Sequence, residues 1–424
     1  MRLMKNSGIE WIGDIPSDWE VHRVKSHYSI VSGSGFKPDL QGKLSGDYPV
    51  CKASDISSAG KDLFFAANYI TVDIANREGF SVIPSGSIIF AKIGEAMRKN
   101  NRSICRVDCC ADNNCQGLVP NNIDVDYGYY LFNCIDMKWF DNAGTVPCIN
   151  NQKLKDCGIP FPNIIKQKII SNFLDEKCAE IDTVIEQTKA TIEEYKKLKQ
   201  SVITQAVTKG IRSNRPMKDS GIEWIGKIPE EWEIRRIKTL FSLRDERNFL
   251  PLSQVNLISL YTDKGVMQHS DIDNTTGNKA SNADGYKKVY PNDIVVNIIL
   301  CWMGAIGRSA YKGVTSPAYD VYIPSEFVDS NFYHHYFRTT GFSGDCYKRG
   351  KGIMAMRWRT YSDQFRDINV VYPSLQEQRE IVDYLDKKCS EINELIAKKT
   401  SLLSELESYK KSLIYEYVTG KKEV

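Results

Sequence analysis

A thirteen-residue motif occurs twice in this chain. Residues 7–19 read SGIEWIGDIPSDW, and 213 positions later (220 − 7) residues 220–232 read SGIEWIGKIPEEW. We call each copy an opening motif. The second copy begins near the middle of a chain of 424 residues, which is long for a single core. The spacing therefore predicts two copies of one structural unit.

A second pair of segments repeats at an offset of 211 (367 − 156). Residues 156–182 read DCGIPFPNIIKQKIISNFLDEKCAEID, and residues 367–393 read DINVVYPSLQEQREIVDYLDKKCSEIN. The identical pairs include Pro162 and Pro373, Gln167 and Gln378, Leu174 and Leu385, and Cys178 and Cys389. Each half is predicted to contain an opening motif, a body, and a proline-terminated strand that leads into a long helix. Two copies are too few for a solenoid, so we expect a pseudo-two-fold object.

Two long helices are predicted from the absence of proline and glycine and from the spacing of apolar residues. Neither 163–209 nor 374–419 contains proline or glycine. Asn163 is a predicted N-cap, and Ser374 with Glu377 is a predicted capping box. Apolar residues recur every three or four positions with charged flanks, which is typical of a coiled coil. The predicted seam comprises Leu174, Cys178, Ile181, Ile185, Ile192, Leu385, Cys389, Ile392, Ile396 and Leu403.

A lone helix of about 45 residues, about 65 Å long, would leave its apolar stripe in water. The two helices are therefore predicted to pack on each other, and a two-fold axis requires them to run in opposite directions. The predicted fold class is α/β (α+β), with two α/β domains at opposite ends of a long antiparallel coiled coil. The alternative is that each helix packs on its own body. The predicted boundaries are 1–158 and 213–369 for the domains, and 159–212 and 370–424 for the helices.

The two bodies, residues 20–158 and 233–369, differ widely outside the repeated segments. Apolar runs at 85–94 (SGSIIFAKIG) and 292–300 (NDIVVNIIL) predict buried strands bounded by turns. We call the segments that repeat in both halves, the opening motifs and the long helices with their preceding strands, the frame. A duplicated frame with diverged bodies is expected if each body recognises a different target. The tryptophans of the opening motifs recur in both halves, so they are predicted to pack each body against the helix ends; a partner-docking surface is the alternative. They are Trp11, Trp19, Trp224 and Trp232.

This pattern resembles the specificity subunit of type I restriction–modification systems over the whole chain. The resemblance rests on the two opening motifs, the diverged bodies and the PSLQEQREIVDYLD helix start at Pro373. The first helix departs from it with PNIIKQKII. The resemblance implies that each body is a target-recognition domain for half of a bipartite DNA sequence, and that the helices act as a ruler and dock methyltransferase subunits. It implies two such subunits, a restriction/translocase subunit, and S-adenosylmethionine, ATP and Mg²⁺ bound by those partners.

The rod-like spacer predicts half-sites about one helical turn apart, on the order of 34 Å, and different bodies predict an asymmetric target. The net charge of +3 neither demands nor excludes an anionic partner. No apolar leader and no run long enough to span a bilayer is present, so we expect a cytoplasmic protein. Its twelve cysteines are then expected to be reduced.

No catalytic signature stands out, and the chain is predicted not to be an enzyme. It has neither a GxxxxGK[ST] phosphate loop nor the Asn/Asp-Pro-Pro-aromatic motif of amino-methyltransferases. The triplet at 175–177 (DEK) is interpreted as a solvated helix face. The five histidines lack paired spacing, so no metal site is predicted. The cysteines at 105, 109, 110 and 115 match no standard zinc spacing and are interpreted as buried thiols.

Candidate DNA contacts come from basic segments of both bodies. Arginine and lysine neutralise phosphate or pair with guanine, and asparagine pairs with adenine. An ordinary solvated loop is the alternative for each segment. The candidates are Arg98, Lys99, Asn100, Asn101 and Arg102 in the first body, and Arg308, Lys348, Arg349, Lys351, Arg357 and Arg359 in the second.

Three hypotheses remain open from the sequence. The first is a DNA-reading subunit without catalysis of its own. The second is a coiled-coil adaptor whose twin domains bind protein or glycan. The third is an enzyme that uses a metal at the cysteine cluster 105–115.

Overall fold

The computed structural model describes residues 3–142, 144–269, 282–352 and 358–424. Arg357, one of the candidate DNA contacts, lies outside these residues. The chain forms two compact units. The first comprises Met1–Lys189 with Ser401–Val424, and the second comprises Ala190–Thr400. Each unit therefore contains one body and one end of each long helix.

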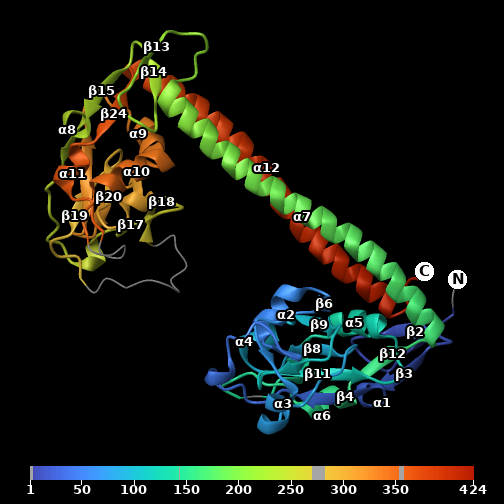
Figure 1. Ribbon diagram of the computed structural model, residues 1–424. Coiled ribbons are helices and arrows are strands. Elements are labelled where there is room, and N and C mark those ends of the chain that lie inside the picture. The colour runs from blue at the N-terminus through green and yellow to red at the C-terminus, as the bar shows by residue number, and fades with distance from the viewer. Residues whose placement is uncertain (1–2, 143, 270–281, 353–357) are drawn as a thin grey trace. The chain divides into compact units, whose positions relative to one another are not determined.

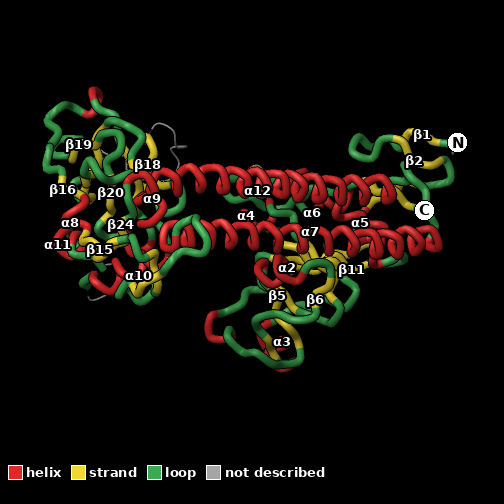
Figure 2. The backbone as a smooth tube through the Cα atoms, turned by 90° about the horizontal axis from the view of Figure 1, so that it is seen from above, coloured by secondary structure: helices red, strands yellow, loops and turns green. Residues whose placement is uncertain are grey.

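The long helices are α7 (Ile164–Lys209) and α12 (Leu375–Val418), each unbroken along its length (Figures 1 and 2). In the first unit, bonds join Lys166 to Glu423 (3.0 Å) and Asp182 to Lys410 (2.6 Å). In the second unit, bonds join Lys199 to Asn393 (2.8 Å) and Arg212 to Glu380 (2.6 Å). Residue numbers rise along α7 as they fall along its partner, so the helices are antiparallel in both units, as predicted.

The predicted seam is buried where the two helices meet. Seven of its residues are buried: Leu174, Cys178, Ile185, Ile192, Leu385, Cys389 and Ile392. Ile181, Ile396 and Leu403 are half-buried. Leu174 shares the core of the first unit with Leu413 and Val418, and Leu385 shares that of the second with Ile203 and Val207. The helices thus pack on each other and also join the cores of the bodies, which combines the two alternatives.

The first body is built on a five-stranded sheet. Its strand order is β4 (Tyr28–Ser32), β11 (Cys115–Pro120), β8 (Ile88–Ala91), β9 (Arg102–Cys105) and β6 (Asp62–Leu63). All neighbours are antiparallel except β6 and β9. A smaller sheet has the order β10 (Cys110–Ala111), β5 (Tyr48–Cys51) and β7 (Tyr69–Ile70). The predicted strand at 85–94 contains β8, which is buried along its whole length.

The remaining elements of the first unit connect these sheets to the helices. Strand β12 (Gly158–Phe161) pairs with β3 (Glu20–Arg23), and β1 (Met4–Asn6) pairs with β2 (Asp14–Pro16). The short helices are α1 (Val24–His27), α2 (Ala53–Ala59), α3 (Val72–Glu78), α4 (Gly94–Arg98), α5 (Val125–Asn133) and α6 (Asn151–Asp156), with 3₁₀ turns at Pro38–Leu40 and Met137–Phe140.

The second body repeats the main sheet with four strands. Their order is β16 (Phe241–Leu243), β23 (Tyr319–Pro324), β20 (Ile294–Asn297) and β21 (Ile306–Arg308). They match β4, β11, β8 and β9 in order and direction. The predicted strand at 292–300 contains β20, which is also buried throughout. The second body has no counterpart of β6 in this sheet among its described residues.

Smaller pairs complete the second unit. Strand β15 (Glu233–Arg236) pairs with β24 (Asn369–Tyr372), and β13 (Met217–Asp219) with β14 (Lys227–Pro229). A hairpin joins β17 (Ile258–Tyr261) to β18 (Gly265–Gln268), and β19 (Lys287–Val289) pairs with β22 (Gly313–Thr315). The helices are α8 (Ile237–Leu240), α9 (Ser330–Phe337), α10 (Thr340–Arg349) and α11 (Ser362–Arg366), with 3₁₀ turns at Leu252–Gln254 and Cys301–Met303.

The two helix starts are capped differently. The Asn163 side chain accepts a hydrogen bond from the Lys166 amide (2.9 Å), which confirms the predicted N-cap. The Ser374 hydroxyl accepts one from the Glu377 amide (3.3 Å). The predicted capping box is nevertheless wrong, because the buried Glu377 carboxylate accepts hydrogen bonds from Trp232 (2.8 Å) and Arg215 (2.6 Å) instead.

The opening motifs pack against helix C-termini. In the first unit, Lys421 donates to the carbonyl of Ile12 (2.9 Å) just beyond the end of α12. In the second, Lys209 donates to the carbonyl of Ile225 (2.6 Å), which occupies the same motif position. Trp19 and Trp232 are buried in the respective cores. Trp11 and Trp224 are half-buried and pack against the same two cores. The predicted packing role is confirmed, with Trp19 and Trp232 fully inside the cores and the other two at their margins.

Candidate nucleic-acid interface

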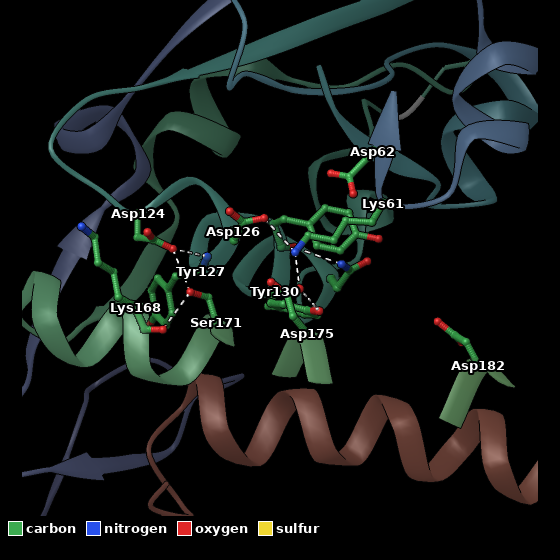
Figure 3. Close-up of polar contacts among 12 residues, drawn as sticks. Lys61, Asp62, Asp124, Asp126, Tyr127, Tyr130, Lys168, Ser171, Asp175 and Asp182 are labelled. Atoms are coloured by element: carbon green, nitrogen blue, oxygen red, sulfur yellow. Dashed lines mark hydrogen bonds and ion pairs between the residues drawn. The ribbon is translucent and has the colours of Figure 1, made fainter. Parts of the chain in front are cut away.

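A charged network fixes the first body to α7. The Lys61 ammonium group, just before β6, contacts the carboxylates of Asp126 (2.7 Å) and Asp175, and lies between them (Figure 3). The Tyr130 hydroxyl donates to Asp175 as well (2.7 Å), and Arg106 contacts Asp126 (2.7 Å). Burial lowers the pKa of Lys61, but its bonds to the two carboxylates outweigh this effect and leave the pKa raised.

This network corrects the interpretation of 175–177 as a solvated helix face. Asp175 is half-buried against the body, and Tyr130 reaches it from α5. Glu176 is exposed, and Lys177 pairs along the helix with Glu180 (3.0 Å), as expected for a solvated face. Asp175 therefore positions the body rather than facing water alone.

The described residues of the second unit form no equivalent network at the aligned position. Asp386 is the residue that aligns with Asp175 at the offset of 211, and it is exposed. Among the described residues it forms no ion pair. The neighbouring titratable side chain from the body is His335 of α9, whose pKa is influenced by the charge of Asp386. In the part of the second body that the structure describes, no lysine lies between two carboxylates at its helix.

A cleft of about 890 Å³ lies between the second body and the unit-2 segments of α7 and α12. Its basic and imidazole lining residues come from α7, from the β17–β18 turn and from α9 with the residue that follows it. They are Lys196, Lys199, Lys264, His334, His335 and Arg338. Asp263 is the single acidic residue among the described lining residues. The cleft is therefore electropositive.

Arg338 lies in this cleft, and no carboxylate of the described residues bonds to its guanidinium group. Its nitrogens donate to the carbonyl oxygens of Ile306 (3.1 Å), Thr262 (3.0 Å) and Asp263 (2.9 Å). Burial lowers the pKa of Arg338, and the nearby charge of Asp263 opposes that change. The guanidinium group ties the β17–β18 turn to the sheet.

In the first body, the basic segment at 97–102 divides into structural and exposed residues. Arg102 is 4% exposed, and its guanidinium group donates to the carbonyl oxygens of Phe132, in the last turn of α5, and Ile135, just beyond that helix. Asn100 adopts a positive φ of 59° and accepts a hydrogen bond from the Met137 amide (3.0 Å). Both side chains stabilise the body, so neither is free to contact DNA.

The other three residues of that segment reach the surface. Arg98 is exposed and pairs with Glu95 (2.7 Å) within α4. Lys99 is exposed, and the exposed Asn101 donates to the Ser57 hydroxyl (2.9 Å). Only three of the five candidate residues in this segment are therefore exposed and available for DNA contact.

In the second body, the end of α10 and a short backbone bridge gather the basic candidates. The Lys351 amide donates to the Arg359 carbonyl (2.8 Å), and the Arg359 amide returns a bond (3.0 Å). Trp358 stacks on Tyr347, with ring centroids 4.9 Å apart. Lys348, Arg349 and Lys351 are exposed and Arg359 is half-buried. Four of the predicted cations thus lie at the end of α10 or in the backbone bridge beside it.

The side chains of Arg308 and Lys348 are bonded to other residues of the second unit. Arg308, at the end of β21, is half-buried and donates twice to the Asn292 side chain (2.9 and 2.7 Å). Lys348 pairs with Glu223 of the second opening motif (2.7 Å). Both residues therefore already have partners that DNA would have to displace or share.

The cysteine cluster consists of buried thiols. Cys105, Cys109, Cys110 and Cys115 are each fully buried, and the sulfur atoms of Cys105 and Cys109 lie 3.3 Å apart. All twelve cysteines are free. Within the described ranges, no group of three or more histidine, cysteine, aspartate or glutamate residues is arranged to hold a metal ion. No helix in those ranges is both long and apolar enough to cross a membrane.

The fold defines a class of tandemly duplicated protein, in which two α/β bodies share one pair of antiparallel helices. The family model for the type I restriction modification DNA specificity domain matches twice, at residues 16–194 and 229–405. Each match covers a body with the adjoining part of its helix. The chain belongs to this family.

Curated relatives agree with this assignment over part of their length. The putative type I restriction enzyme MjaX specificity subunit of Methanocaldococcus jannaschii is 26% identical over 236 residues, 53% of this chain and 52% of the relative. The MjaIX specificity subunit of the same organism is 23% identical over 255 residues, 56% of this chain and 55% of the relative. The chain thus spans about half the length of the curated relatives it matches.

Solved structures share the fold along nearly the whole chain. A chain from work on complex assembly and conformational transition of the type I R-M system has a TM-score of 0.68 at 13% identity, covering 96% of this chain and 99% of its own length. The HsdS subunit from Thermoanaerobacter tengcongensis has a TM-score of 0.52 at 14% identity, covering 96% and 98%. At these identities the likeness shows the fold alone.

Proposed function

We propose that this protein is the DNA-reading subunit of a type I restriction–modification complex and has no catalytic activity of its own. Each body reads one half of a bipartite duplex target. The observation that supports this most strongly is the duplicated family domain, whose two bodies share the strand order of the main sheet while their sequences differ. Different bodies on one frame give two different half-sites, so the target is asymmetric.

The proposed DNA contacts are the exposed or half-buried basic residues of both bodies, together with the exposed Asn101. Arg98, Lys99 and Asn101 act in the first body. Arg308, Lys348, Arg349, Lys351 and Arg359 act in the second, and Arg357 stays a candidate outside the described residues. Their lysines position the duplex through phosphate contacts, while arginine and asparagine side chains also have the donor geometry to read base edges. Arg102 and Asn100 are withdrawn, because their polar groups bind the body's own backbone.

The proposed partners supply the chemistry. Two methyltransferase subunits dock on the solvent faces of α7 and α12, and a restriction/translocase subunit joins through them. S-adenosylmethionine, ATP and Mg²⁺ bind to those partners. Because its target is chromosomal and incoming DNA, the protein would act in the cytoplasm.

Two measurements test the proposal. Methylome sequencing of a host with and without the gene should show one bipartite, asymmetric motif that disappears on deletion. Binding of random duplexes should weaken steeply as salt rises, because bound lysines and arginines release counterions from DNA. An unchanged methylome together with salt-insensitive or absent duplex binding would favour the adaptor for protein or glycan.

A further inference from the structure

The cleft of the second unit concentrates positive charge that the carboxylates of the described residues neutralise only in part. Lys199 donates to the neutral side chain of Asn393 (2.8 Å), and Arg338 donates to backbone carbonyls. Lys264 is exposed at the β17–β18 turn. Among the described residues none of these three forms an ion pair with a carboxylate. Asp263 is close enough to influence Arg338, but its carboxylate is not bonded to the guanidinium group. A half-buried guanidinium ion that bonds only neutral acceptors is costly, and an anion in the cleft would offset that cost.

The cleft also offers an oriented neutral donor. The Nδ1 atom of His334 accepts a hydrogen bond from the Arg308 amide (3.1 Å). The neutral ring must therefore carry its proton on Nε2. Burial, together with the charges of His335, Arg338 and Arg308, lowers the pKa of His334 to about 3, so the ring is neutral near pH 7. The hydroxyl side chains of Thr340 and Ser343 line the same space.

The first unit uses the aligned position differently. There the Asp175 carboxylate bonds to Lys61 and Tyr130, and the carboxylates of Asp126 and Asp175 together neutralise the lysine. In the second unit Asp386 is exposed, and the cationic residues of the cleft face open space rather than a carboxylate pair. The surplus charge is thus a property of the second half, not of the shared frame.

We propose that this cleft is a binding site for phosphate groups. Several cations with hydroxyl and imidazole donors match an anion that carries multiple charged oxygen atoms. A volume of about 890 Å³ is large enough for a phosphate with the group attached to it. The phosphate belongs either to a DNA backbone or to a free nucleotide-like ligand. The DNA form rests on the proposed function, whereas the free-ligand form does not.

The experiment compares two triple variants of the full chain that lose equal charge. The cleft variant is Lys196→Gln, Lys199→Gln and Lys264→Gln. The control variant is Lys189→Gln, Lys197→Gln and Lys312→Gln, all exposed lysines that do not line the cleft. Lys189 matches Lys196, because each pairs with a glutamate three residues earlier on α7. Arg338 is left intact because it holds the β17–β18 turn, and thermal melting verifies that both variants fold.

Two probes separate the sources of phosphate. Calorimetry measures inorganic pyrophosphate binding, and a salt titration measures binding of a random-sequence duplex. For a DNA backbone in the cleft, the slope of log affinity against log salt falls by about two to three in the cleft variant, because about 0.9 counterion is lost per contact. The control variant should change by less than about one. For a free ligand, pyrophosphate binding weakens about tenfold or more in the cleft variant alone, while the two DNA slopes agree.

The proposal is overturned if the cleft and control variants match in both measurements. A wild-type chain that binds no duplex would count against the proposed function. In that case pyrophosphate binding alone decides the cleft: weakening confined to the cleft variant supports the site, and equal or absent binding in all three proteins rejects it.

Discussion

The two halves share the hydrogen bonds that join each body to the start of its long helix. They differ farther along the helices, where the body makes its other contacts. In the first half, the Asp124 amide donates to the Gln167 side chain (2.8 Å). In the second, the Asp329 amide donates to the aligned Gln378 (2.8 Å). Each bond joins the cap of a body helix to the first turn of α7 or α12. The repeated glutamine therefore marks a repeated contact.

A buried tyrosine repeats in the same way. The Tyr127 hydroxyl donates to the carbonyl of Pro160 (3.1 Å), and the Tyr333 hydroxyl donates to that of Val371 (2.9 Å). Pro160 and Val371 are aligned at the offset of 211. Away from these contacts the halves diverge, because one has the Lys61 network and the other the cationic cleft. The contacts between each body and the start of its helix are therefore the same in both halves, whereas the neighbouring surfaces of the bodies have diverged.

The largest expected effect tests the shared frame. Leu174→Ala and Leu385→Ala each remove a fully buried side chain at aligned positions. Each should cost about 2–5 kcal/mol of unfolding free energy, because a cavity replaces packed methyl groups. Chemical denaturation of the full chain measures both. Costs that differ by more than about 2 kcal/mol would mean that the two ends of the seam are not equivalent.

The next effect tests the difference between the halves. Asp175→Asn removes a charged partner of Lys61 and should cost about 1–2 kcal/mol. Asp386→Asn is the matched control and should change stability by less than about 0.5 kcal/mol, because Asp386 is exposed. Denaturation curves of the two variants give the comparison directly. Equal costs would show that Asp175 has no special role in fixing the first body.

The second half should show a pH effect that depends on His334, because burial lowers the pKa of that side chain. The pKa of His334 is about 3 when folded and about 6.5 when unfolded, so the unfolded chain binds more protons between these values. Stability from this group is therefore complete above pH 6.5 and falls as the pH decreases below it. From pH 7.5 to 5.5 the loss should be about 1 kcal/mol.

The variant His334→Asn retains a side-chain acceptor for the Arg308 amide and does not titrate. Thermal melts at both pH values should show a smaller stability difference than in the wild type by about 1 kcal/mol. An identical pH dependence in the two proteins would reject the assignment of this effect to His334.

The smallest effect concerns the surface cations. Arg98→Gln with Lys99→Gln should weaken duplex binding about three- to fivefold, and so should Arg349→Gln with Lys351→Gln. Each pair removes two exposed charges from one body. Binding to duplexes with one mutated half-site should show which half each pair affects. Loss of contact with the same half-site in both variants would contradict one reader per body.

The repeats predicted the frame because its determinants are local. A proline- and glycine-free run, an N-cap at Asn163 and apolar residues at helical spacing are sufficient to specify α7 and its seam. Glu377 shows the limit of such local reasoning. Its spacing from Ser374 predicts a capping box, but Arg215 and Trp232 bind its carboxylate from elsewhere in the fold. A charge-assisted bond from Arg215 competes successfully with the local amide.

The site was less predictable because distant segments build it. Arg102 belongs to a basic run that is typical of a surface loop, yet it begins β9, and its side chain bonds to carbonyl oxygens at the end of α5. Lys61 and Asp175 are 114 positions apart, and no motif links them. The cleft lysines come from α7 and the β17–β18 turn. Charge clusters assembled by packing leave no linear signature.

The central claim is that one frame carries two separate DNA readers, and exchange of one body tests it most directly. Residues 20–158 of the full chain are replaced by the corresponding body of another family member, and host DNA methylation is sequenced. We predict that one half of the bipartite motif changes while the other half and the spacing between them remain. A change in both halves, or in neither, would contradict the claim.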